Sequence, residues 1–313
     1  MTRLLITGAL GHIGAQYALH IQPRSYDEIV LLDKNLDPSV SYPYPLPMGN
    51  KYRLLKADIL NDDLKSIFSG IDVVFHLAAI TDATHSIETR AEIFMVNLEG
   101  TRRVAQACAV NHCKMLFLST TSIYGTNKDF VDESSPLEDI HPQNPYAESK
   151  LIAEQYLLEL AKESNFQFTI LRLGTTIGTS VGMRFHTAVN KFCWQACHNE
   201  PITVWRTAFH QYRPYTHIED VLRVLSYIVE TDQFDNGIYN VVTINTTVSH
   251  VIEVIRRVLP GIQVIDVDSP VMNQYSFRAS SQRIIEKGFY FTGSLEHGIE
   301  DTIRYIQSGI NNI

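Results

Sequence analysis

The sequence predicts an α/β fold in which helices cover both faces of a mainly parallel sheet. Two observations support it: short, continuous apolar runs typical of buried parallel strands, and longer segments with helical apolar spacing that alternate with them. The apolar runs are residues 3–6, 29–32, 71–77 and 114–119, and the helical segments include residues 100–109 and 146–161. Because the two kinds of element alternate, the predicted architecture is a Rossmann-type doubly wound sheet.

The 313 residues are enough for one large α/β unit that carries a smaller appended part. We expect residues 1–173 to form the sheet domain and residues 174–313 to form mainly a second lobe. Glycines become frequent after residue 173, and a new helical stretch begins near Phe185. Residues 212–242 are expected to return to the first domain, and the proline-rich residues 37–49 to form an irregular surface excursion.

Composition and charge exclude several classes of protein. With 45% hydrophobic and 19% charged residues the chain has a globular composition, and its longest apolar runs are too short to span a bilayer. The net charge of −8 argues against a nucleic-acid partner, which requires clustered Lys and Arg. The N-terminus lacks the pattern of a secretion signal and the four cysteines make no disulfide framework, so we expect a cytoplasmic protein.

A glycine motif, Gly8-x-x-Gly11-x-x-Gly14, follows the first apolar run and precedes a helical stretch. Such glycines permit a tight turn, close approach of the backbone to a pyrophosphate, and packing of helix against strand. The amides and positive dipole end of the helix, which includes His12 and Ile13, then face the phosphates. Glycines also occur in ordinary turns, but a strand, a glycine turn and a helix in this order predict a dinucleotide site.

Asp33 ends the second apolar run, about twenty residues beyond the glycines, where a carboxylate accepts hydrogen bonds from the adenosine ribose. The same carboxylate repels a 2′-phosphate, so we predict NAD rather than NADP as the cofactor. The alternative is that Asp33 only caps the following loop. The neighbouring Lys34 leaves some tolerance for NADP and is included with the cofactor-binding residues.

A second motif, Tyr146-Ala147-Glu148-Ser149-Lys150, places Tyr146 and Lys150 four residues apart on one helix face. The Lys150 ammonium and an oxidised nicotinamide would favour the tyrosinate and lower the pKa of Tyr146 towards neutrality. The phenol could then exchange a proton with a substrate hydroxyl. An isolated pair of this kind is common on solvated helices, and it becomes specific in combination with the glycine motif.

Nine segments, in order and spacing, resemble the signatures of the extended short-chain dehydrogenase/reductase family, in its NAD-dependent nucleotide-sugar epimerase/dehydratase group. They are TGALGHIG at residues 7–14, HLAA at 76–79, NLEGT at 97–101, SIYG at 122–125, PYAESK at 145–150, LRLG at 171–174, YTHIEDV at 215–221, GIYNV at 237–241, and residues 288–305. The resemblance therefore covers nearly the whole chain.

The resemblance implies a catalytic triad in which Tyr146 is the acid/base, Lys150 binds the nicotinamide ribose and Thr120 lies beside the reacting hydroxyl. Counting back from Gly125 favours Thr120 over its hydroxyl-bearing neighbours. His76 is expected to be a structural residue at a strand end rather than a general base. Further cofactor-binding residues implied by the resemblance are Asp58, Ile59, Leu77, Ala78, Ala79 and Asn97.

The residues before Tyr124 bear on the reaction, because the related sugar 4,6-dehydratases carry an Asp-Glu pair where this chain has Thr121-Ser122. A dehydratase needs the acid to protonate a departing hydroxyl and the glutamate to remove a proton beside the ketone. The lack of this pair disfavours a dehydratase and leaves an epimerase, a 4-keto reductase or a dehydrogenase. We favour an epimerase that acts at sugar C4 through a transient 4-keto sugar and retains its NAD, because a reductase must exchange its cofactor and often uses NADPH, whereas Asp33 indicates NAD. The alternatives are a nucleotide-sugar 4-keto reductase or dehydrogenase, a dehydrogenase of small alcohols, and a non-catalytic NAD-binding regulatory protein.

The second lobe is expected to bind the nucleotide-sugar substrate. Arg213 falls where the family uses an arginine on the substrate pyrophosphate, whereas Tyr275 replaces another family arginine, with Arg278 close by. Arg184 would pair with a carboxylate if the sugar is a uronate, or would only be solvated at the surface. The predicted substrate-binding residues are Thr81, Arg184, Asn190, Arg213 and Arg278.

Two further expectations concern metals and assembly. Cys193 and the Cys197-His198 pair lack a second group of ligands and are expected to pack in the core, so no metal is predicted. The family resemblance implies a homodimer in which the helices at residues 100–109 and 146–161 pair across a two-fold axis.

Overall fold

The structure, a computed structural model, describes residues 2–37, 47, 49–81, 89–125, 128–183, 185, 187–268 and 276–310. The chain divides into two compact units, one with residues 1–123, 144–172 and 222–239 and the other with residues 124–143, 173–221 and 240–313. Residues 124–143 thus group with the second unit, although the sequence boundaries placed them in the sheet domain. Most of the proline-rich excursion lies outside the described residues, and no helix within them is long and apolar enough to cross a membrane.

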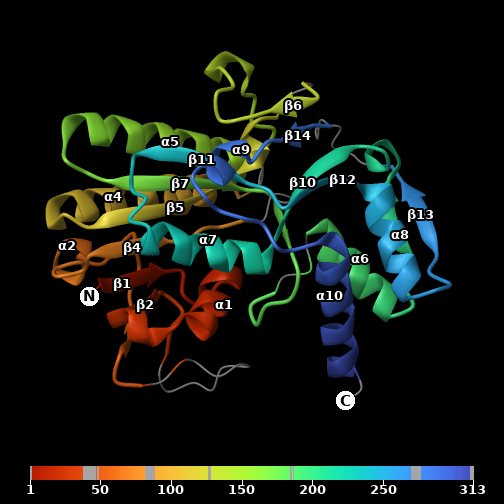
Figure 1. The fold of residues 1–313 in the computed structure, drawn as a ribbon, viewed down its shortest axis with the longest axis horizontal. Coiled ribbons are helices and arrows are strands. Elements are labelled where there is room, and N and C mark those ends of the chain that lie inside the picture. The colour runs from red at the N-terminus through yellow and green to blue at the C-terminus, as the bar shows by residue number, and fades with distance from the viewer. Residues whose placement is uncertain are drawn as a thin grey trace. The chain divides into compact units, whose positions relative to one another are not determined.

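The first unit is built around a sheet whose strands are β1 (Thr2–Thr7), β2 (Tyr26–Asp33), β3 (Tyr52–Lys56), β4 (Val73–His76), β5 (Lys114–Thr120), β7 (Phe168–Leu173) and β11 (Gly237–Val241). Their order is β11-β7-β5-β4-β1-β2-β3 (Figure 1). Strands β1 to β5 pair in parallel, so their carboxyl ends share one edge of the sheet. This topology confirms the predicted α/β, Rossmann-type doubly wound fold.

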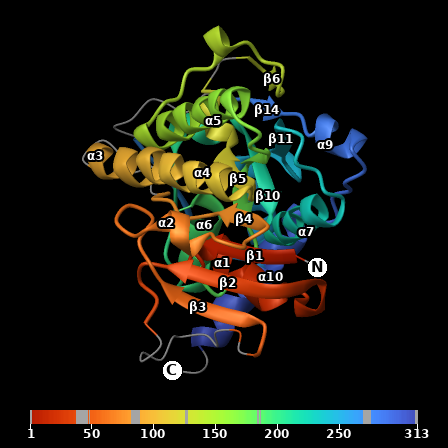
Figure 2. The ribbon, with the colours of Figure 1, turned by 90° about the vertical axis from the view of Figure 1, so that its left-hand side faces the viewer.

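Helices cover both faces of this sheet. They are α1 (His12–His20), α2 (Leu64–Ile67), α3 (Arg90–Ile93), α4 (Gly100–Asn111), α5 (Pro145–Glu163) and α7 (Ile218–Glu230), with the π-helical η2 (Phe94–Glu99) and the 3-10 turns η1 (Pro23–Ser25) and η3 (Thr121–Ile123). Helices α4 and α5 lie side by side (Figures 1 and 2). Val74 packs in one core cluster with residues of α4 and α5, whereas the neighbouring Phe75 ring lies 5.3 Å from the Tyr17 ring of α1. Successive residues of β4 therefore face opposite helical layers.

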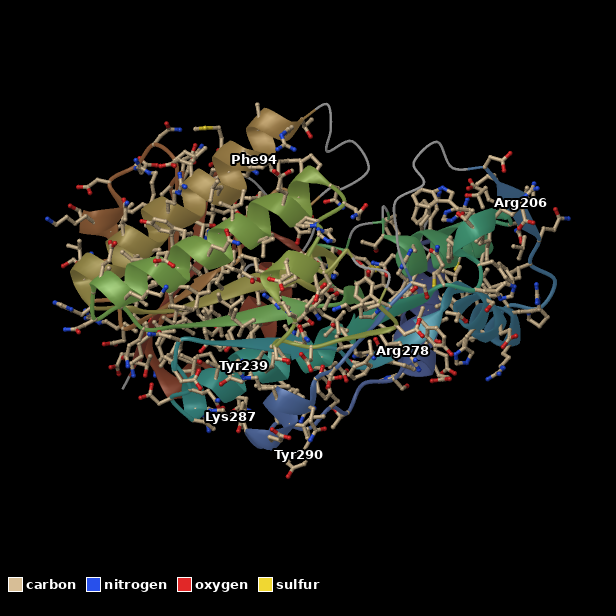
Figure 3. The ribbon with its side chains drawn as sticks, turned by 90° about the horizontal axis from the view of Figure 1, so that it is seen from above. Phe94, Arg206, Tyr239, Arg278, Lys287 and Tyr290 are labelled. Atoms are coloured by element: carbon tan, nitrogen blue, oxygen red, sulfur yellow. The ribbon has the colours of Figure 1, made fainter. Side chains whose placement is uncertain are left out.

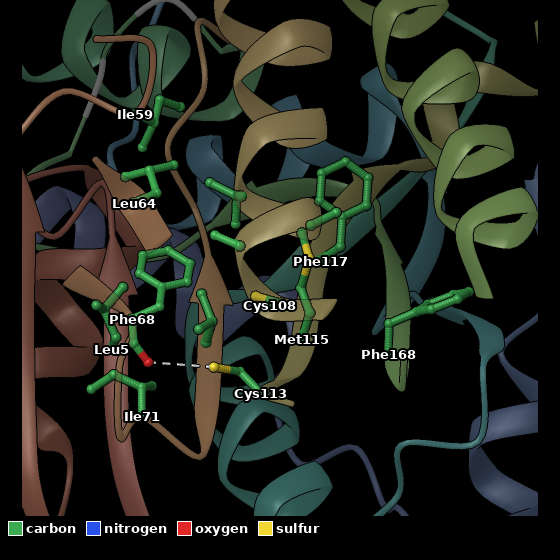
Figure 4. Packing of buried hydrophobic residues seen from close by; sticks show 14 of the residues in the cluster. Leu5, Ile59, Leu64, Phe68, Ile71, Cys108, Cys113, Met115, Phe117 and Phe168 are labelled. Atoms are coloured by element: carbon green, nitrogen blue, oxygen red, sulfur yellow. Dashed lines mark hydrogen bonds between the residues drawn. The ribbon is translucent and has the colours of Figure 1, made fainter. Parts of the chain in front are cut away.

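The main core of the first unit lies between the sheet and the layer formed by α4 and α5 (Figure 4). Phe68, Met115 and Phe117 are fully buried in it. The Cys113 thiol donates to the carbonyl oxygen of Phe68 at 3.7 Å. Since the packing continues to the last residues of β5, polar groups at the end of that strand have rigid surroundings.

The first turn of α5 is defined by its capping residues. The Asn144 side chain accepts a hydrogen bond from the Ala147 amide at 2.9 Å, and Pro145 occupies the first turn, where the missing N–H removes no helical bond. This start determines the direction in which Tyr146 and Lys150 leave the helix.

The second unit has its own small sheets and core. Its strands are β6 (Phe130–Val131), β8 (Thr175–Ile177), β9 (Ile202–Trp205), β10 (Tyr212–His217), β12 (Ile244–Thr247), β13 (Val264–Val267) and β14 (Arg278–Ala279), which pair as β12-β10-β8, β13-β9 and β14-β6. Its helices are α6 (Ala188–Cys197), α8 (Val248–Val258), α9 (Gln282–Glu286) and α10 (Leu295–Ile310), with 3-10 turns η4 (Leu137–Asp139) and η5 (Arg206–Ala208). Phe192, Ile255 and Ile299 represent the core between α6, α8 and α10.

Candidate active site

The glycine motif forms a turn in which a Cβ atom at any of the three glycine positions would crowd backbone atoms. Gly8 has a φ of +70°, and a Cβ atom on it would lie 2.6 Å from the backbone nitrogen of Ala78. A Cβ atom would lie 2.4 Å from the Gly8 carbonyl oxygen if placed on Gly14, and 3.1 Å from it if placed on Gly11. The turn therefore brings β1, the segment after β4 and the start of α1 together through backbone atoms.

The start of α1 is suited to an anion. Gly11 precedes the helix in an extended conformation, no side chain caps it, and the first turn contains no acidic residue. Backbone amides at such a helix start can donate to a pyrophosphate, which can approach the backbone closely at the glycines. The geometry therefore fits the dinucleotide phosphates that the sequence predicted for Gly8, Gly11, His12, Ile13 and Gly14.

Asp33 lies at the end of β2, almost fully buried against the glycine turn. One carboxylate oxygen accepts from the Leu10 amide at 3.1 Å, and the other accepts from the Asn35 amide at 2.9 Å. The side chain therefore does cap the following loop, as the alternative interpretation held. A carboxylate oxygen can accept more than one hydrogen bond, so the predicted ribose contact is compatible with this arrangement. Lys34 beside it is exposed.

Asp58 and Ile59 follow β3 and have mainly local contacts. The Asp58 carboxylate accepts from the Leu60 amide at 2.9 Å and from the Asn61 side chain at 2.8 Å. Ile59 is buried against the start of α4, where a Cβ atom on Gly100 would lie 2.6 Å from the Ile59 Cδ1 atom. Their contact with adenine stays a prediction.

A buried chain of hydrogen bonds supports the segment after β4. The Thr7 hydroxyl lies 2.8 Å from His76 Nδ1, and His76 Nε2 lies 3.0 Å from the Thr101 hydroxyl. The Thr7 oxygen also accepts from the amides of Leu77 and Ala78, both at 3.3 Å. Burial lowers the pKa of His76 to about 3, so the ring is neutral. His76 therefore serves as a structural link, and it supports the residues predicted to lie along the cofactor, including Ala79.

Asn97 joins this segment to the helix α5. Its side chain accepts from the Ile80 amide at 2.8 Å and donates to the Ile80 carbonyl oxygen at 2.9 Å. The same amide nitrogen lies 3.3 Å from the Ser149 hydroxyl, which donates to the Tyr146 carbonyl oxygen at 2.7 Å. Asn97 belongs to the π-helical η2, a rare geometry that often occurs at functional sites.

The predicted triad comes together between the end of β5 and the first turns of α5. The Thr120 side chain lies near enough to the Tyr146 phenol to lower its pKa as a hydrogen-bonding group. The Lys150 ammonium donates to the Leu118 carbonyl oxygen at 2.9 Å and lies 4.4 Å from the centre of the Phe117 ring. The structure thus brings Thr120 close to Tyr146 and places Lys150 one helical turn further on, against β5.

Burial shifts both titratable groups of the triad towards their neutral forms. It raises the pKa of Tyr146 to about 12, and the hydrogen bond with Thr120 offsets only part of this rise. It lowers the pKa of Lys150 to about 7, against the opposing effect of Glu154. In the protein alone the pKa of Tyr146 therefore moves opposite to the direction expected with oxidised nicotinamide bound, because burial desolvates the phenol.

Sequence reasoning missed a buried ion pair beside the triad. The Arg172 guanidinium on β7 lies 2.6 Å from the Glu154 carboxylate on α5, and both side chains are at most 5% exposed. Two signals pointed to it: Glu154 follows Lys150 by four residues, and Arg172 is a lone charge within an apolar strand run.

The predicted substrate residues are placed in different environments. The Arg213 guanidinium donates to Gln211 at 2.6 Å, and burial lowers its pKa to about 10. Asn190 is buried on α6. Arg278 lies on β14 (Figure 3), and its guanidinium is 5.2 Å from the centre of the Tyr212 ring on β10. These three belong to the second unit and Thr81 to the first, whereas Arg184 and Tyr275 lie outside the described residues.

Comparison with known proteins identifies the family. The model of the NAD dependent epimerase/dehydratase family matches residues 4–242. The chain belongs to this family. The match confirms the family, the enzyme class and the NAD cofactor that the sequence predicted.

Curated relatives within this family include both epimerases and dehydratases. An uncharacterized UDP-glucose epimerase of Bacillus subtilis is 26% identical over 239 residues, which are 72% of each chain. A dTDP-D-glucose 4,6-dehydratase of Mus musculus is 25% identical over 328 residues, which are 99% of this chain and 90% of the relative. A trifunctional Arabidopsis thaliana enzyme, a UDP-glucose 4,6-dehydratase with epimerase and reductase activities, is 26% identical over 96% of this chain, but the match spans 46% of that enzyme.

Solved structures share the fold over nearly the full length. The UDP-glucuronic acid 4-epimerase from Bacillus cereus, in complex with UDP-glucuronic acid and NAD, has a TM-score of 0.87 and 24% identity, with 98% of this chain and 99% of the other covered. The UDP-glucose 4-epimerase from Thermotoga maritima has a TM-score of 0.83 and 21% identity, with coverages of 99% and 100%.

Proposed function

We propose that this chain is an NAD-dependent nucleotide-sugar epimerase that inverts C4 of the sugar through a transient 4-keto sugar. The observation that carries the proposal is the close approach of the Thr120 side chain to the Tyr146 phenol, with the buried Lys150 ammonium one turn along the same helix, against β5. A non-catalytic NAD-binding protein would not need Thr120, Tyr146 and Lys150 together, which argues against a regulatory protein. The epimerases among the relatives and structural neighbours support the choice of reaction.

Each member of the triad has a separate role in the proposed mechanism. Tyr146 takes the proton from the C4 hydroxyl as the ketone forms and returns it to the ketone oxygen when the opposite configuration is made. Thr120 holds the hydroxyl and the phenol in line through its own hydroxyl. Lys150 binds the nicotinamide ribose and supplies positive charge near the phenol. Bound NAD would supply the redox chemistry, as acceptor and then donor of the C4 hydride.

The residues that would hold NAD come from the carboxyl ends of the parallel strands, where ligands of such sheets bind. The glycine turn and the start of α1 would bind the pyrophosphate, and Asp33 the adenosine ribose. The full set of proposed cofactor contacts is Gly8, Gly11, His12, Ile13, Gly14, Asp33, Lys34, Asp58, Ile59, Leu77, Ala78, Ala79, Asn97, Tyr146 and Lys150.

The proposed substrate is a UDP-sugar, since the epimerases named above act on UDP-sugars. Arg213 suits the substrate pyrophosphate because a guanidinium remains charged even with a pKa near 10. The other proposed substrate contacts are Thr81, Arg184, Asn190 and Arg278.

A 4,6-dehydratase is the most direct competitor, because dehydratases are among the relatives. Where a dehydratase has an acidic Asp-Glu pair, this chain has Thr121 and Ser122. Neither side chain is a carboxylic acid, so neither can serve as the acid or the base of the dehydration. A 4-keto reductase or a dehydrogenase would use the same triad, and only the fate of the nicotinamide separates these from an epimerase.

Two further proposals concern the assembly and the location of the protein. We propose a homodimer formed through α4 and α5, which is supported by the exposure of Val110 on α4 and of Met95 on the preceding η2, 54% and 52% respectively. We also propose a cytoplasmic location, in keeping with four free thiols.

The experiment is incubation of the purified protein with a panel of UDP-sugars, with the product followed by NMR and the nicotinamide by absorbance. An epimerase interconverts one sugar with its C4 isomer while no reduced nicotinamide accumulates. Steady reduction of added NAD coupled to sugar oxidation would replace the epimerase with a dehydrogenase. A product that lacks one hydroxyl group of the substrate sugar would show that the enzyme is a dehydratase instead.

A further inference from the structure

The buried pair of Glu154 and Arg172 has no part in the mechanism above. The Arg172 Nε atom donates to both carboxylate oxygens of Glu154, at 3.1 and 3.2 Å, and Nη2 donates to one of them at 2.6 Å. The Glu154 side chain is 2% exposed and the Arg172 side chain is 5% exposed. A buried ion pair is weak as a source of stability, because desolvation of both groups consumes most of the attraction, so its position deserves a separate explanation.

That position is next to a third buried charge. Glu154 follows Lys150 by four residues on α5, so the two side chains leave the helix on the same face. Lys150 is 3% exposed, and its ammonium has one backbone carbonyl, that of Leu118, and the Phe117 ring as close partners. Neither partner carries a full negative charge. The Glu154 carboxylate is therefore the anion placed to balance Lys150.

The remaining titratable groups around Lys150 do not supply this balance. On β4, His76 is neutral and the Lys150 charge adds to the lowering of its pKa. On α5, Tyr146 is protonated at neutral pH because burial raises its pKa. At the start of the same helix, the Glu148 side chain is 38% exposed and pairs with Arg90 of α3, so solvent screens its charge.

We propose that Glu154, held in place by Arg172, is a positioning residue that balances the buried charge of Lys150 and so keeps its ammonium available to the ribose and to Tyr146. The proposal rests on the proposed function for the task of Lys150. It assigns Arg172 the part of an anchor, which holds the carboxylate buried on the helix face that Glu154 shares with Lys150. In support, Glu154 raises the pKa of Lys150 against the larger effect of burial, and the two together leave that pKa at about 7.

The test uses two substitutions that should act in opposite directions. Glu154→Gln removes the anion and should lower the pKa of Lys150 by about one unit or more, as loss of a nearby opposite charge does. Arg172→Met leaves the anion without its own counter-charge and should raise the pKa of Lys150. Glu154→Gln alone leaves Arg172 buried without its partner, which can prevent folding. The double variant, Glu154→Gln with Arg172→Met, removes both charges of the pair and should also lower the pKa of Lys150. Glu159→Gln is the matched control, because Glu159 lies on the same helix, exposed to solvent.

The measurement is an NMR pH titration of 13C-labelled lysine in the full-length protein as purified, with the Lys150 signal assigned by its loss in Lys150→Met. Opposite shifts in the two single variants, with no change in Glu159→Gln, support the proposal. Equal shifts in the same direction, or no shift in the folded double variant, overturn it. The titration needs no turnover, so it reports on Glu154 even if every UDP-sugar fails as a substrate. The pH dependence of NAD affinity should move with the Lys150 pKa in the same variants.

Discussion

The glycine turn allows a sharp test of whether its shape or only its flexibility is required. Gly8→Ala introduces a methyl group at a φ of +70°, with its carbon 2.6 and 2.7 Å from two backbone atoms of Ala78. The left-handed conformation costs an L-residue about 1–2 kcal/mol, and overpacking against a backbone that cannot rotate away adds roughly 1–3 kcal/mol. We expect Gly8→Ala to lower the free energy of unfolding by roughly 2–5 kcal/mol.

The matched control is Gly261→Ala. Gly261 also has a positive φ, +92°, but a Cβ atom there meets nothing within 4 Å. It should lose only the conformational part, about 1–2 kcal/mol. Urea denaturation without added nucleotide gives both free energies, and calorimetric titration gives the affinity for NAD. If the two variants lose equal stability, the close approach of Gly8 to Ala78 is not real. If Gly8→Ala binds NAD as tightly as the unmodified protein, the turn does not hold the cofactor.

Three further predictions concern chemistry, cofactor choice and pH. Tyr146→Phe should lower kcat by about 10²–10⁴-fold and leave NAD and UDP-sugar affinities nearly unchanged in steady-state and binding assays, since it removes only the proton-transfer group. Asp33→Ala should narrow the preference for NAD over NADP, measured as a ratio of dissociation constants; a preference that does not change would refute the ribose contact. The pKa of His76 is about 3 in the folded protein, so below pH 6.5 only the unfolded chain binds this proton. Stability should therefore fall as pH drops from 6.5 towards 3, by on the order of 4 kcal/mol for this group, and His76→Gln should flatten that slope in urea denaturation.

The parts of the site that could be predicted from sequence are those in which one local pattern determines the geometry. The spacing of Gly8, Gly11 and Gly14 predicted a tight turn between a strand and a helix, because both elements are visible as apolar patterns. The position of Asp33 followed in the same way from the end of an apolar run. Helical spacing alone placed Tyr146 and Lys150 on one face, whereas Thr120 was predicted only from the family resemblance, and the structure brings it close to Tyr146.

What could not be predicted depends on burial and on contacts between distant segments. The direction of the Tyr146 pKa depends on how deeply the phenol is desolvated, and a sequence pattern contains no such depth. The pairing of Glu154 with Arg172 requires knowledge of which side of β7 faces α5. The grouping of residues 124–143 with the second unit likewise follows from contacts made far along the chain, such as the 2.9 Å hydrogen bond from the Tyr124 phenol to Asn240.

The shifted pKa values of Tyr146 and Lys150 also bear on the proton transfer proposed for this site. Burial favours the neutral phenol of Tyr146 and, by lowering the pKa of Lys150 to about 7, also favours the neutral form of the lysine. A phenol with a pKa of about 12 is a poor base at that pH, because its deprotonation is about five pKa units uphill, on the order of 7 kcal/mol. Positive charge close to the phenol reduces this difference, and the lysine can supply it only while it holds its proton. The carboxylate of Glu154 therefore bears on the chemistry of Tyr146 through Lys150, although it lies two helical turns away from the phenol along α5.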